Sequence, residues 1–123
     1  MTRSRYMSGW GASRSKYGNH KVVTDDGTFD SEKEYRRYRE LKILEAIGQV
    51  SDIKRQVEYE LIPNQRDEHG KLIERKVTYK ADFVYKDETG SEIVEDVKGF
   101  KTKEYILKRK MMLNKYGIRI MEV

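Results

Sequence analysis

Two stretches of the chain repeat apolar residues at the spacing of an α-helix. The first begins at Ser31 and Glu34, which fit the S-x-x-E capping box, and it ends at Gly48. Its apolar residues follow at threefold spacing on one face, namely Tyr35, Tyr38, Leu41 and Leu44. The second stretch covers about residues 103–116, and Gly117 follows its last turn. The pattern therefore predicts two amphipathic helices with charged outer faces.

The region between the two helices alternates apolar and polar residues with the period of a β-strand. Three strands are expected, at 53–61, at about 73–85 and at 92–98. The polar stretch from Pro63 to Gly70 predicts a loop, and the tight turn at 86–90 joins the second and third strands into a hairpin.

Both ends of the chain add to this pattern. Residues 118–123 predict a last strand, and Val22 and Val23 indicate a short edge strand before the turn at Asp25-Asp26-Gly27. Residues 1–20 are rich in Ser, Gly and Arg and have no apolar period, which predicts a flexible basic arm. Residues 21–123 are then expected to form one domain.

The order of these elements is helix, three strands, helix, strand. Three consecutive strands form a meander, and a crossover helix returns the chain to a further strand. The sequence therefore predicts an α/β fold, in which a mixed sheet is flanked by helices.

Composition narrows the classes of function. The chain has 123 residues, no cysteine and a net charge of +5. Disulfides and thiolate zinc sites are excluded, and no apolar run approaches the ~20 residues of a membrane span, so a cytoplasmic protein is expected. Basic residues gather at both ends: seven Lys or Arg against two acids from 99 to 123, and no acid from 1 to 23. This favours a polyanionic partner, although a solvated basic surface explains the charge as well.

The candidate chemistry lies in the hairpin. In the third strand Asp96 and Lys98 share one parity, while Glu95 points to the opposite face. Asp82 shares parity with Val84, on the face opposite to the one predicted for Tyr79, Phe83 and Tyr85, so the hairpin should bring Asp82 beside Asp96. Two adjacent carboxylates repel each other and favour a cation, for which Mg²⁺ is the natural choice. The alternative is an exposed sheet face on which these charges meet water.

These motifs together resemble the PD-(D/E)XK nuclease superfamily, and more narrowly a family of small phage-encoded nucleases related to RecU-type Holliday-junction resolvases. The resemblance extends over about residues 16–123. One departure is Ala81, where the superfamily pattern has Pro. The resemblance rests on the basic second helix and on four short motifs. These motifs are Lys16-Tyr17-Gly18, Phe29-Asp30-Ser31-x-x-Glu34, Tyr79-x-Ala81-Asp82-Phe83 and Asp96-Val97-Lys98-Gly99.

The resemblance implies a role for each matching residue. Asp82, Asp96 and the Val97 carbonyl are expected to be metal ligands, and Lys98 to orient the attacking water and steady charge in the transition state. It also implies that Glu34 completes the acidic set, unless its role is only to cap the first helix. Gln56 is expected either to neighbour the site or to lie on a solvated strand face.

Basic residues supply the expected DNA contacts. Arg109 lies in the middle of an apolar arc on the second helix, so it is expected either to reach the acidic site or the scissile phosphate or to extend past the core edge into solvent. The arc is formed by Tyr105, Ile106, Met112, Leu113 and Tyr116. The expected phosphate contacts are Arg3, Arg5, Arg14 and Lys16 in the arm, and Lys101, Lys103, Lys108, Arg109 and Lys110 at the second helix.

The sequence thus leads to one main hypothesis and two alternatives. The main hypothesis is a Mg²⁺-dependent DNA endonuclease, in which Mn²⁺ also serves, acting as a homodimer on branched DNA in phage recombination or replication within the host cell. The alternatives are a nicking or end-processing nuclease and a DNA-binding accessory protein that does not cleave. His20 and His69 are too few and too far apart for a zinc or HNH nuclease, and no phosphate-binding P-loop is present.

Overall fold

The computed structural model describes residues 20–98 and 100–123, which form two compact units. The first unit ends at Lys42, and the second is Ile43–Val123. The predicted domain at 21–123 spans both units, whereas the predicted arm lies outside the described residues except for His20. In this described part of the chain, no helix is long and apolar enough to cross a membrane.

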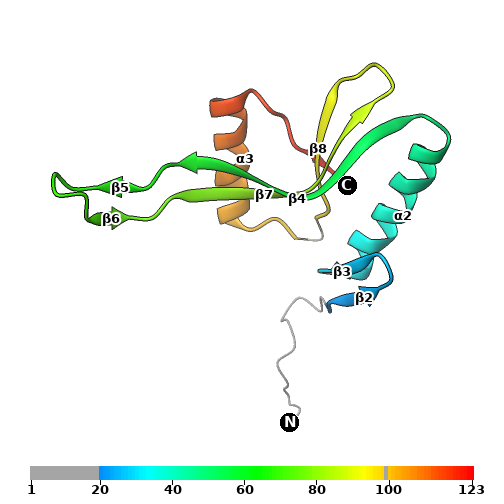
Figure 1. Ribbon diagram of the computed structural model, residues 1–123, viewed down its shortest axis with the longest axis horizontal. Coiled ribbons are helices and arrows are strands. Elements are labelled where there is room, and N and C mark those ends of the chain that lie inside the picture. Colours follow the sequence, from blue (N-terminus) through cyan, green and yellow to red (C-terminus); the bar gives the residue numbers. More distant parts are fainter. Residues whose placement is uncertain (1–19, 99) are drawn as a thin grey trace, which may run out of the picture. The chain divides into compact units, whose positions relative to one another are not determined.

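The first unit consists of a short hairpin and most of a helix (Figure 1). Strands β2 (Val22–Thr24) and β3 (Gly27–Phe29) pair antiparallel, so the strand expected at Val22 belongs to a separate two-stranded sheet. The Thr24 hydroxyl donates to the Gly27 carbonyl at 2.9 Å and accepts from the Asp26 N–H at 3.0 Å, which closes the turn.

Helix α2 (Glu32–Ala46) begins at the predicted capping site. The Ser31 hydroxyl accepts a hydrogen bond from the Glu34 N–H at 3.1 Å, as the capping box requires. The Glu34 carboxylate accepts from the Asp30 N–H at 2.8 Å, one residue before the expected donor. Within the helix, Glu34 and Leu41 are buried, so the buried face is narrower than the apolar pattern predicts.

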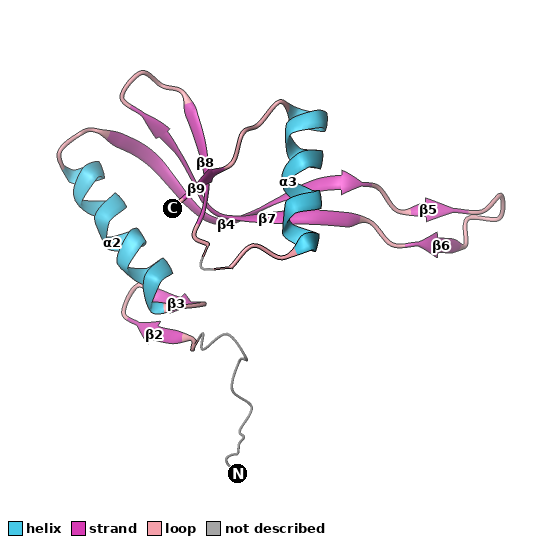
Figure 2. Ribbon diagram, turned by 180° about the vertical axis from the view of Figure 1, so that it is seen from behind, coloured by secondary structure: helices cyan, strands magenta, loops and turns pink. Residues whose placement is uncertain are grey.

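The second unit is built on a four-stranded mixed sheet in the order β4-β7-β8-β9 (Figures 1 and 2). Strands β4 (Val50–Ile62), β7 (Val77–Asp87) and β8 (Glu92–Asp96) pair antiparallel in sequence order. Helix α3 (Lys103–Tyr116) then returns the chain to β9 (Met121–Glu122), which lies parallel to β8. The predicted α/β class with a mixed sheet is confirmed.

A short hairpin, called the β5–β6 arm from here on, replaces the loop predicted between the first two strands. Strands β5 (Gln65–Arg66) and β6 (Leu72–Glu74) pair antiparallel beyond the ends of β4 and β7 (Figure 1). The Asp67 carboxylate accepts from the His69 and Lys71 N–H groups, each at 2.9 Å, and so holds the turn. Most of the arm is exposed on both faces, so no apolar alternation marks it in the sequence.

Helix α3 has the predicted bounds but a different buried face. Its N-cap is Thr102, and Gly117, with a φ of 69°, donates its N–H to the Leu113 carbonyl at 2.9 Å. Leu113 and Tyr116, predicted to be buried, are 52% and 42% exposed because the helix contacts the sheet through a narrower stripe. The buried cluster of this unit comprises Leu61, Tyr79, Ala81, Val84, Val94, Tyr105 and Met112.

Strand β7 does not keep one face along its whole length. Tyr79 and Ala81 join the same buried cluster as Val84, although strict alternation would place them on the opposite face. The prediction that Tyr79 shares a face with Phe83 and Tyr85 is therefore wrong. The alternation changes between Ala81 and Val84, and this change allows Tyr79 to reach the end of β8.

Candidate active site

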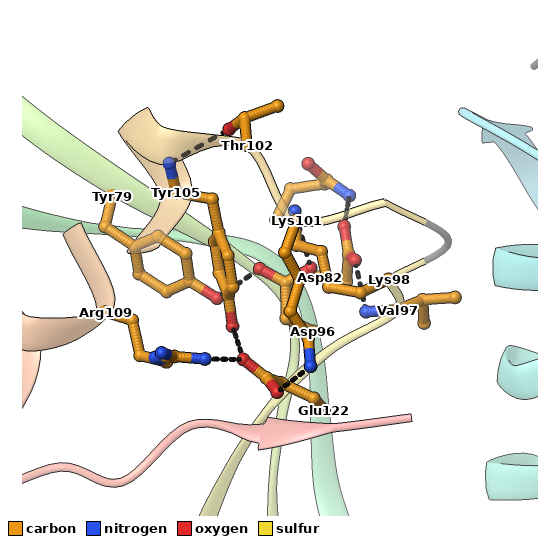
Figure 3. Close-up of polar contacts among 11 residues, drawn as sticks. Tyr79, Asp82, Asp96, Val97, Lys98, Lys101, Thr102, Tyr105, Arg109 and Glu122 are labelled. Carbon is orange, nitrogen blue, oxygen red and sulfur yellow. Dashed lines mark hydrogen bonds and ion pairs between the residues drawn. The ribbon is translucent and has the colours of Figure 1, made fainter. Parts of the chain in front are cut away.

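The carboxylates of Asp82 and Asp96 belong to the polar contacts drawn in Figure 3, and the strand register places both residues at the end of the β7–β8 hairpin that is opposite to its turn. The register pairs Phe83 with Glu95, so Asp82 and Asp96 follow as the next facing positions. The Asp82 Oδ2 atom accepts a hydrogen bond from the Val97 N–H at 2.8 Å. The hairpin thus brings the two predicted acids together.

Asp96 is enclosed by the sheet and by α3. Its Oδ2 atom accepts from the Tyr79 hydroxyl at 2.5 Å, and its side chain is 4% exposed. Burial raises the pKa of Asp96 to about 6, and the charge of Asp82 adds to the rise. The hydrogen bond from Tyr79 and the positive charge of Lys98 oppose it. A nearby cation therefore stabilises the ionised form of Asp96.

Lys98 lies between a carboxylate and an aromatic ring. Its Nζ atom is 3.3 Å from Asp96 Oδ1 and 4.2 Å from the centroid of the Tyr105 ring. A cation at this distance from a ring face is attracted to the ring electrons. The Lys98 side chain is 25% exposed, so it is less buried than the carboxylate with which it pairs.

Tyr105 connects Lys98 to a second charged cluster. Its hydroxyl donates to Glu122 Oε2 at 2.6 Å, and Arg109 donates to the same oxygen at 2.9 Å. Lys101 Nζ lies 3.1 Å from Glu122 Oε1. The hydrogen bonds from Tyr105 and then from Arg109 lower the pKa of Glu122 to about 2. Arg109, which was expected to reach the acidic site or to extend past the core edge, is paired with Glu122, and its side chain is 37% exposed.

Gln56 faces Asp82 across the β4–β7 pair. Its side-chain amide donates to Asp82 Oδ1 at 3.4 Å, so it is a neighbour of the site. Its φ is 53°, in the left-handed region that favours glycine. A non-glycine residue in this conformation stores backbone strain, which is common near functional side chains.

The remaining acids take separate positions. Glu95 is fully buried and accepts a hydrogen bond from the Tyr85 hydroxyl at 2.6 Å, which agrees with its predicted place on the face opposite Asp96. Glu34 belongs to the first unit, where it completes the start of α2. Its expected role as a metal ligand stays a prediction.

The expected phosphate contacts have different local environments. Lys108 forms an ion pair with Glu104 at 3.0 Å, and Lys103 and Lys110 are exposed on α3. Their contacts with DNA stay predictions. The four basic residues expected to act from the arm lie outside the described residues, namely Arg3, Arg5, Arg14 and Lys16.

Three residues beside the two acids were given no role in the site by the sequence analysis: Tyr79, Tyr105 and Glu122. Tyr79 and Tyr105 are buried tyrosines, and a buried hydroxyl requires a partner, which here is a carboxylate in both cases. Glu122 follows Met121 in a two-residue strand, and no motif marks it. The tyrosines carried a usable signal, whereas Glu122 did not.

The donor set at the hairpin end fits a divalent cation. Among the residues that the structure describes, no group of three or more His, Cys, Asp or Glu side chains is arranged to hold a metal ion. Asp82 and Asp96 offer two carboxylates, and Mg²⁺ is commonly held by one or two carboxylates together with water and substrate phosphates. The raised pKa of Asp96, to which Asp82 contributes, is the effect that a cation between them would reverse.

Comparison with known proteins identifies the family but not its activity. No curated protein and no solved structure matches the chain. A family model described as "Protein of unknown function (DUF1064)" matches residues 14–121. The chain belongs to this family.

Proposed function

We propose that this member of the DUF1064 family is a Mg²⁺-dependent endodeoxyribonuclease of the PD-(D/E)XK type. The observation that carries the proposal is the meeting of Asp82, Asp96 and Lys98 at one end of β8. Lys98 Nζ lies 3.3 Å from Asp96 Oδ1, and the pKa of Asp96 is raised partly by the charge of Asp82. Two acids beside a lysine suit the hydrolysis of a phosphodiester that requires both a cation and a fixed positive charge.

Each residue of this group has a distinct role in the proposed reaction. Asp82 and Asp96 would hold the ion, and the Val97 carbonyl is a further oxygen donor by resemblance. A bound Mg²⁺ supplies a Lewis acid and lowers the pKa of coordinated water. Lys98 directs its ammonium toward the phosphate and the attacking water, where it stabilises the negative charge that develops in the transition state.

The arrangement of the sheet supports the same proposal. Three antiparallel strands, a crossover helix and a parallel strand occur in the order that the nuclease core has by resemblance. Helix α3 packs on the sheet through Tyr105 and Met112 and brings Arg109 to Glu122, the residue of β9 that pairs with Asp96. A protein that only binds DNA has no need for two acids at this position, because they weaken phosphate binding unless a cation offsets them.

The substrate within this proposal is branched DNA. The resemblance to RecU-type resolvases supports it, together with the net charge of +5. Resolution of a four-way junction requires two symmetric cuts, which a homodimer with two-fold symmetry supplies. The proposed setting is phage recombination or replication in the cytoplasm of the host cell.

A substrate panel tests the proposal. The purified full chain is incubated with Mg²⁺, Mn²⁺ or EDTA and with matched linear, flap, four-way and single-stranded DNA. We expect cleavage with either metal, none in EDTA, paired nicks in the four-way junction, and a dimer by light scattering. Asp96→Asn serves as the inactive variant, and Glu92→Gln, at an exposed position of the same strand, serves as its matched control.

The outcomes separate the alternatives. Cleavage by a monomer without preference for junctions moves the function to nicking or end processing. Tight DNA binding without cleavage under any metal condition indicates an accessory protein and rejects the proposal.

A further inference from the structure

The Tyr105 ring is placed between the site and the cluster around Glu122 (Figure 3). One ring face has the Lys98 ammonium 4.2 Å from its centroid, and the Arg109 guanidinium carbon lies 5.9 Å from the same centroid. Tyr105 is 6% exposed, and the Tyr79 ring lies 6.4 Å from the Tyr105 ring, centroid to centroid. The ring is therefore fixed by packing on the side away from Lys98.

The hydroxyl of Tyr105 is fixed as firmly as its ring. It donates to Glu122 at 2.6 Å, and this carboxylate is also bound by Arg109 and Lys101. The hydrogen bond from Tyr105, followed by those from Arg109 and Lys101, lowers the pKa of Glu122, and an ionised acceptor forms the stronger hydrogen bond. The backbone N–H of Lys98 donates to the Val123 carbonyl at 3.1 Å, so the same end of the chain also holds the Lys98 main chain.

We propose that Tyr105 is a positioning residue for Lys98, and that Glu122 orients the Tyr105 ring for this purpose. The inference rests on the proposed function and extends it by two residues that the catalytic motif does not contain. A lysine has a long flexible side chain, and its ammonium can occupy many positions. The ring face and Asp96 together restrict the ammonium to one position, beside the carboxylates where a phosphate would bind.

A spectroscopic test addresses the position of Lys98 without any cleavage. In the wild-type protein, we expect the ring current of Tyr105 to shift the NMR signals of the Lys98 side-chain methylene next to the nitrogen upfield, because the Lys98 Nζ atom lies 4.2 Å from the ring centroid. We expect Tyr105→Phe to keep this shift and Tyr105→Leu to abolish it. An unchanged Lys98 signal in Tyr105→Leu overturns the proposal.

A kinetic test addresses the consequence for the reaction. We expect Tyr105→Leu to lower kcat and to leave KM unchanged. The expected fall in kcat is about two- to thirtyfold, which corresponds to the loss of one cation–π contact. Tyr105→Phe, which loses only the hydroxyl, should show a smaller fall. In the Lys98→Ala background, Tyr105→Leu should have no further effect on the residual rate. An equal fall in both backgrounds indicates a purely structural role and rejects the proposal.

Helix α3 offers a matched control at its other end. Tyr116 also has a lysine near its ring, Lys115 at 5.5 Å, and its hydroxyl donates to the Glu60 carbonyl at 2.6 Å. Tyr116→Phe and Tyr116→Leu should leave kcat unchanged.

A third variant keeps the inference testable if Tyr105→Leu does not fold. Glu122→Gln weakens the hydrogen bond that the Tyr105 hydroxyl donates to residue 122, so it should reduce both kcat and the upfield shift of the Lys98 signals. An unchanged value of either quantity overturns the proposal. If the wild-type chain cleaves no DNA, the proposed function fails, whereas the NMR result still decides whether Tyr105 positions Lys98.

Discussion

The two ends of the β7–β8 hairpin use carboxylates in opposite ways. At the turn, Asp87 is satisfied by its neighbours: its Oδ1 atom accepts from the Thr89 N–H at 2.9 Å and from the Ser91 N–H at 3.0 Å. The Thr89 side-chain hydrogen bond lowers the pKa of Asp87. At the open end, burial raises the pKa of Asp96 to about 6.

The charge of Asp87 stabilises the folded state, whereas the charges of Asp82 and Asp96 destabilise it. The partners of Asp87 lie within four residues and close the turn, so its charge favours folding. Asp82 and Asp96 come from different strands and place two like charges together, which folding alone does not favour. Groups whose pKa is shifted against their charged form gather at functional sites. The open end of the hairpin is therefore the end at which we propose the functional site.

The backbone beside the site also differs from the backbone of the turn itself. In the turn, the positive φ of 87° falls on Gly90, which adopts it without strain. Beside the open end, a positive φ of 53° falls on Gln56, whose side chain contacts Asp82. Asp52, with a φ of 57°, is a second non-glycine residue in this region, so strain in the described part of β4 is not confined to the neighbourhood of the two acids.

The largest expected effect is the loss of cleavage when the open end is changed. Asp96→Asn, Asp82→Asn and Lys98→Ala should each reduce DNA cleavage by at least about a hundredfold, since each removes a charge from the proposed reaction. The two Asp variants should also lose Mg²⁺ binding, measured by calorimetry, whereas Lys98→Ala should retain it.

The turn and the opposite face provide the controls for this prediction. Asp87→Asn should lower the melting temperature and leave the cleavage rate intact, because it alters only the turn. Glu95→Gln should keep most of the activity, because Glu95 binds Tyr85 on the other face. Full activity in Asp96→Asn or Lys98→Ala contradicts the assignment of the site.

The next effect concerns the strained neighbour. Gln56→Gly should reduce cleavage about tenfold, as is typical when a partner of a metal-binding side chain is removed. The same change relieves the positive φ, so the free energy of unfolding should be unchanged or higher by up to about 1 kcal/mol. Gln56→Ala should reduce cleavage equally without the gain in stability, and urea denaturation distinguishes the two variants.

The pairing of Asp82 with Asp96 and the order of the strands can be predicted from the sequence alone. Alternation in β8 separates Asp96 from Glu95, and the tight turn sets the register that brings Asp82 to Asp96. These are local effects with a period of two, which a single sequence displays directly. The order of strands follows from the same pattern and from the crossover helix.

The contacts of Glu122 and Tyr79 were not predicted from the sequence, because they join segments that are distant along the chain. Glu122 meets Tyr105 across seventeen residues of chain, and Tyr79 meets Asp96 across the same separation. The second contact requires the change of face in β7, which interrupts the alternation on which the prediction relied. The β5–β6 arm was missed for another reason, since its exposed faces carry no apolar period.

A third prediction contrasts the pH dependence of stability at the two ends, measured in EDTA. The pKa of Asp96 is raised from 3.8 to about 6, so between these values the folded state holds more protons than the unfolded state. The free energy of unfolding should therefore decrease as pH rises from about 4 to about 6, by up to about 1.4 kcal/mol per pH unit. Above pH 6 this contribution is constant.

Asp87 contributes with the opposite sign. Its lowered pKa stabilises the fold above the ordinary value of 3.8, and this stability is lost as the pH falls below it. In urea denaturation at pH 3–7, Asp96→Asn should remove the decrease between about 4 and 6. Asp87→Asn should remove part of the loss at lower pH. An unaltered slope in Asp96→Asn would mean that this carboxyl does not titrate in the expected range.

The smallest expected effect comes from the hydroxyl of Tyr79. Its hydrogen bond at 2.5 Å lowers the pKa of Asp96 and so opposes the effect of burial. Tyr79→Phe should therefore move the end of the stability decrease to a higher pH, and lower the free energy of unfolding by about 1 kcal/mol. Tyr85→Phe is the matched control, because Tyr85 is buried and donates to Glu95 at 2.6 Å on the opposite face. It should cost similar stability and leave the pH at which the decrease ends unchanged. If both variants shift that pH equally, the titration belongs to the hairpin as a whole and not to the end that carries Asp96.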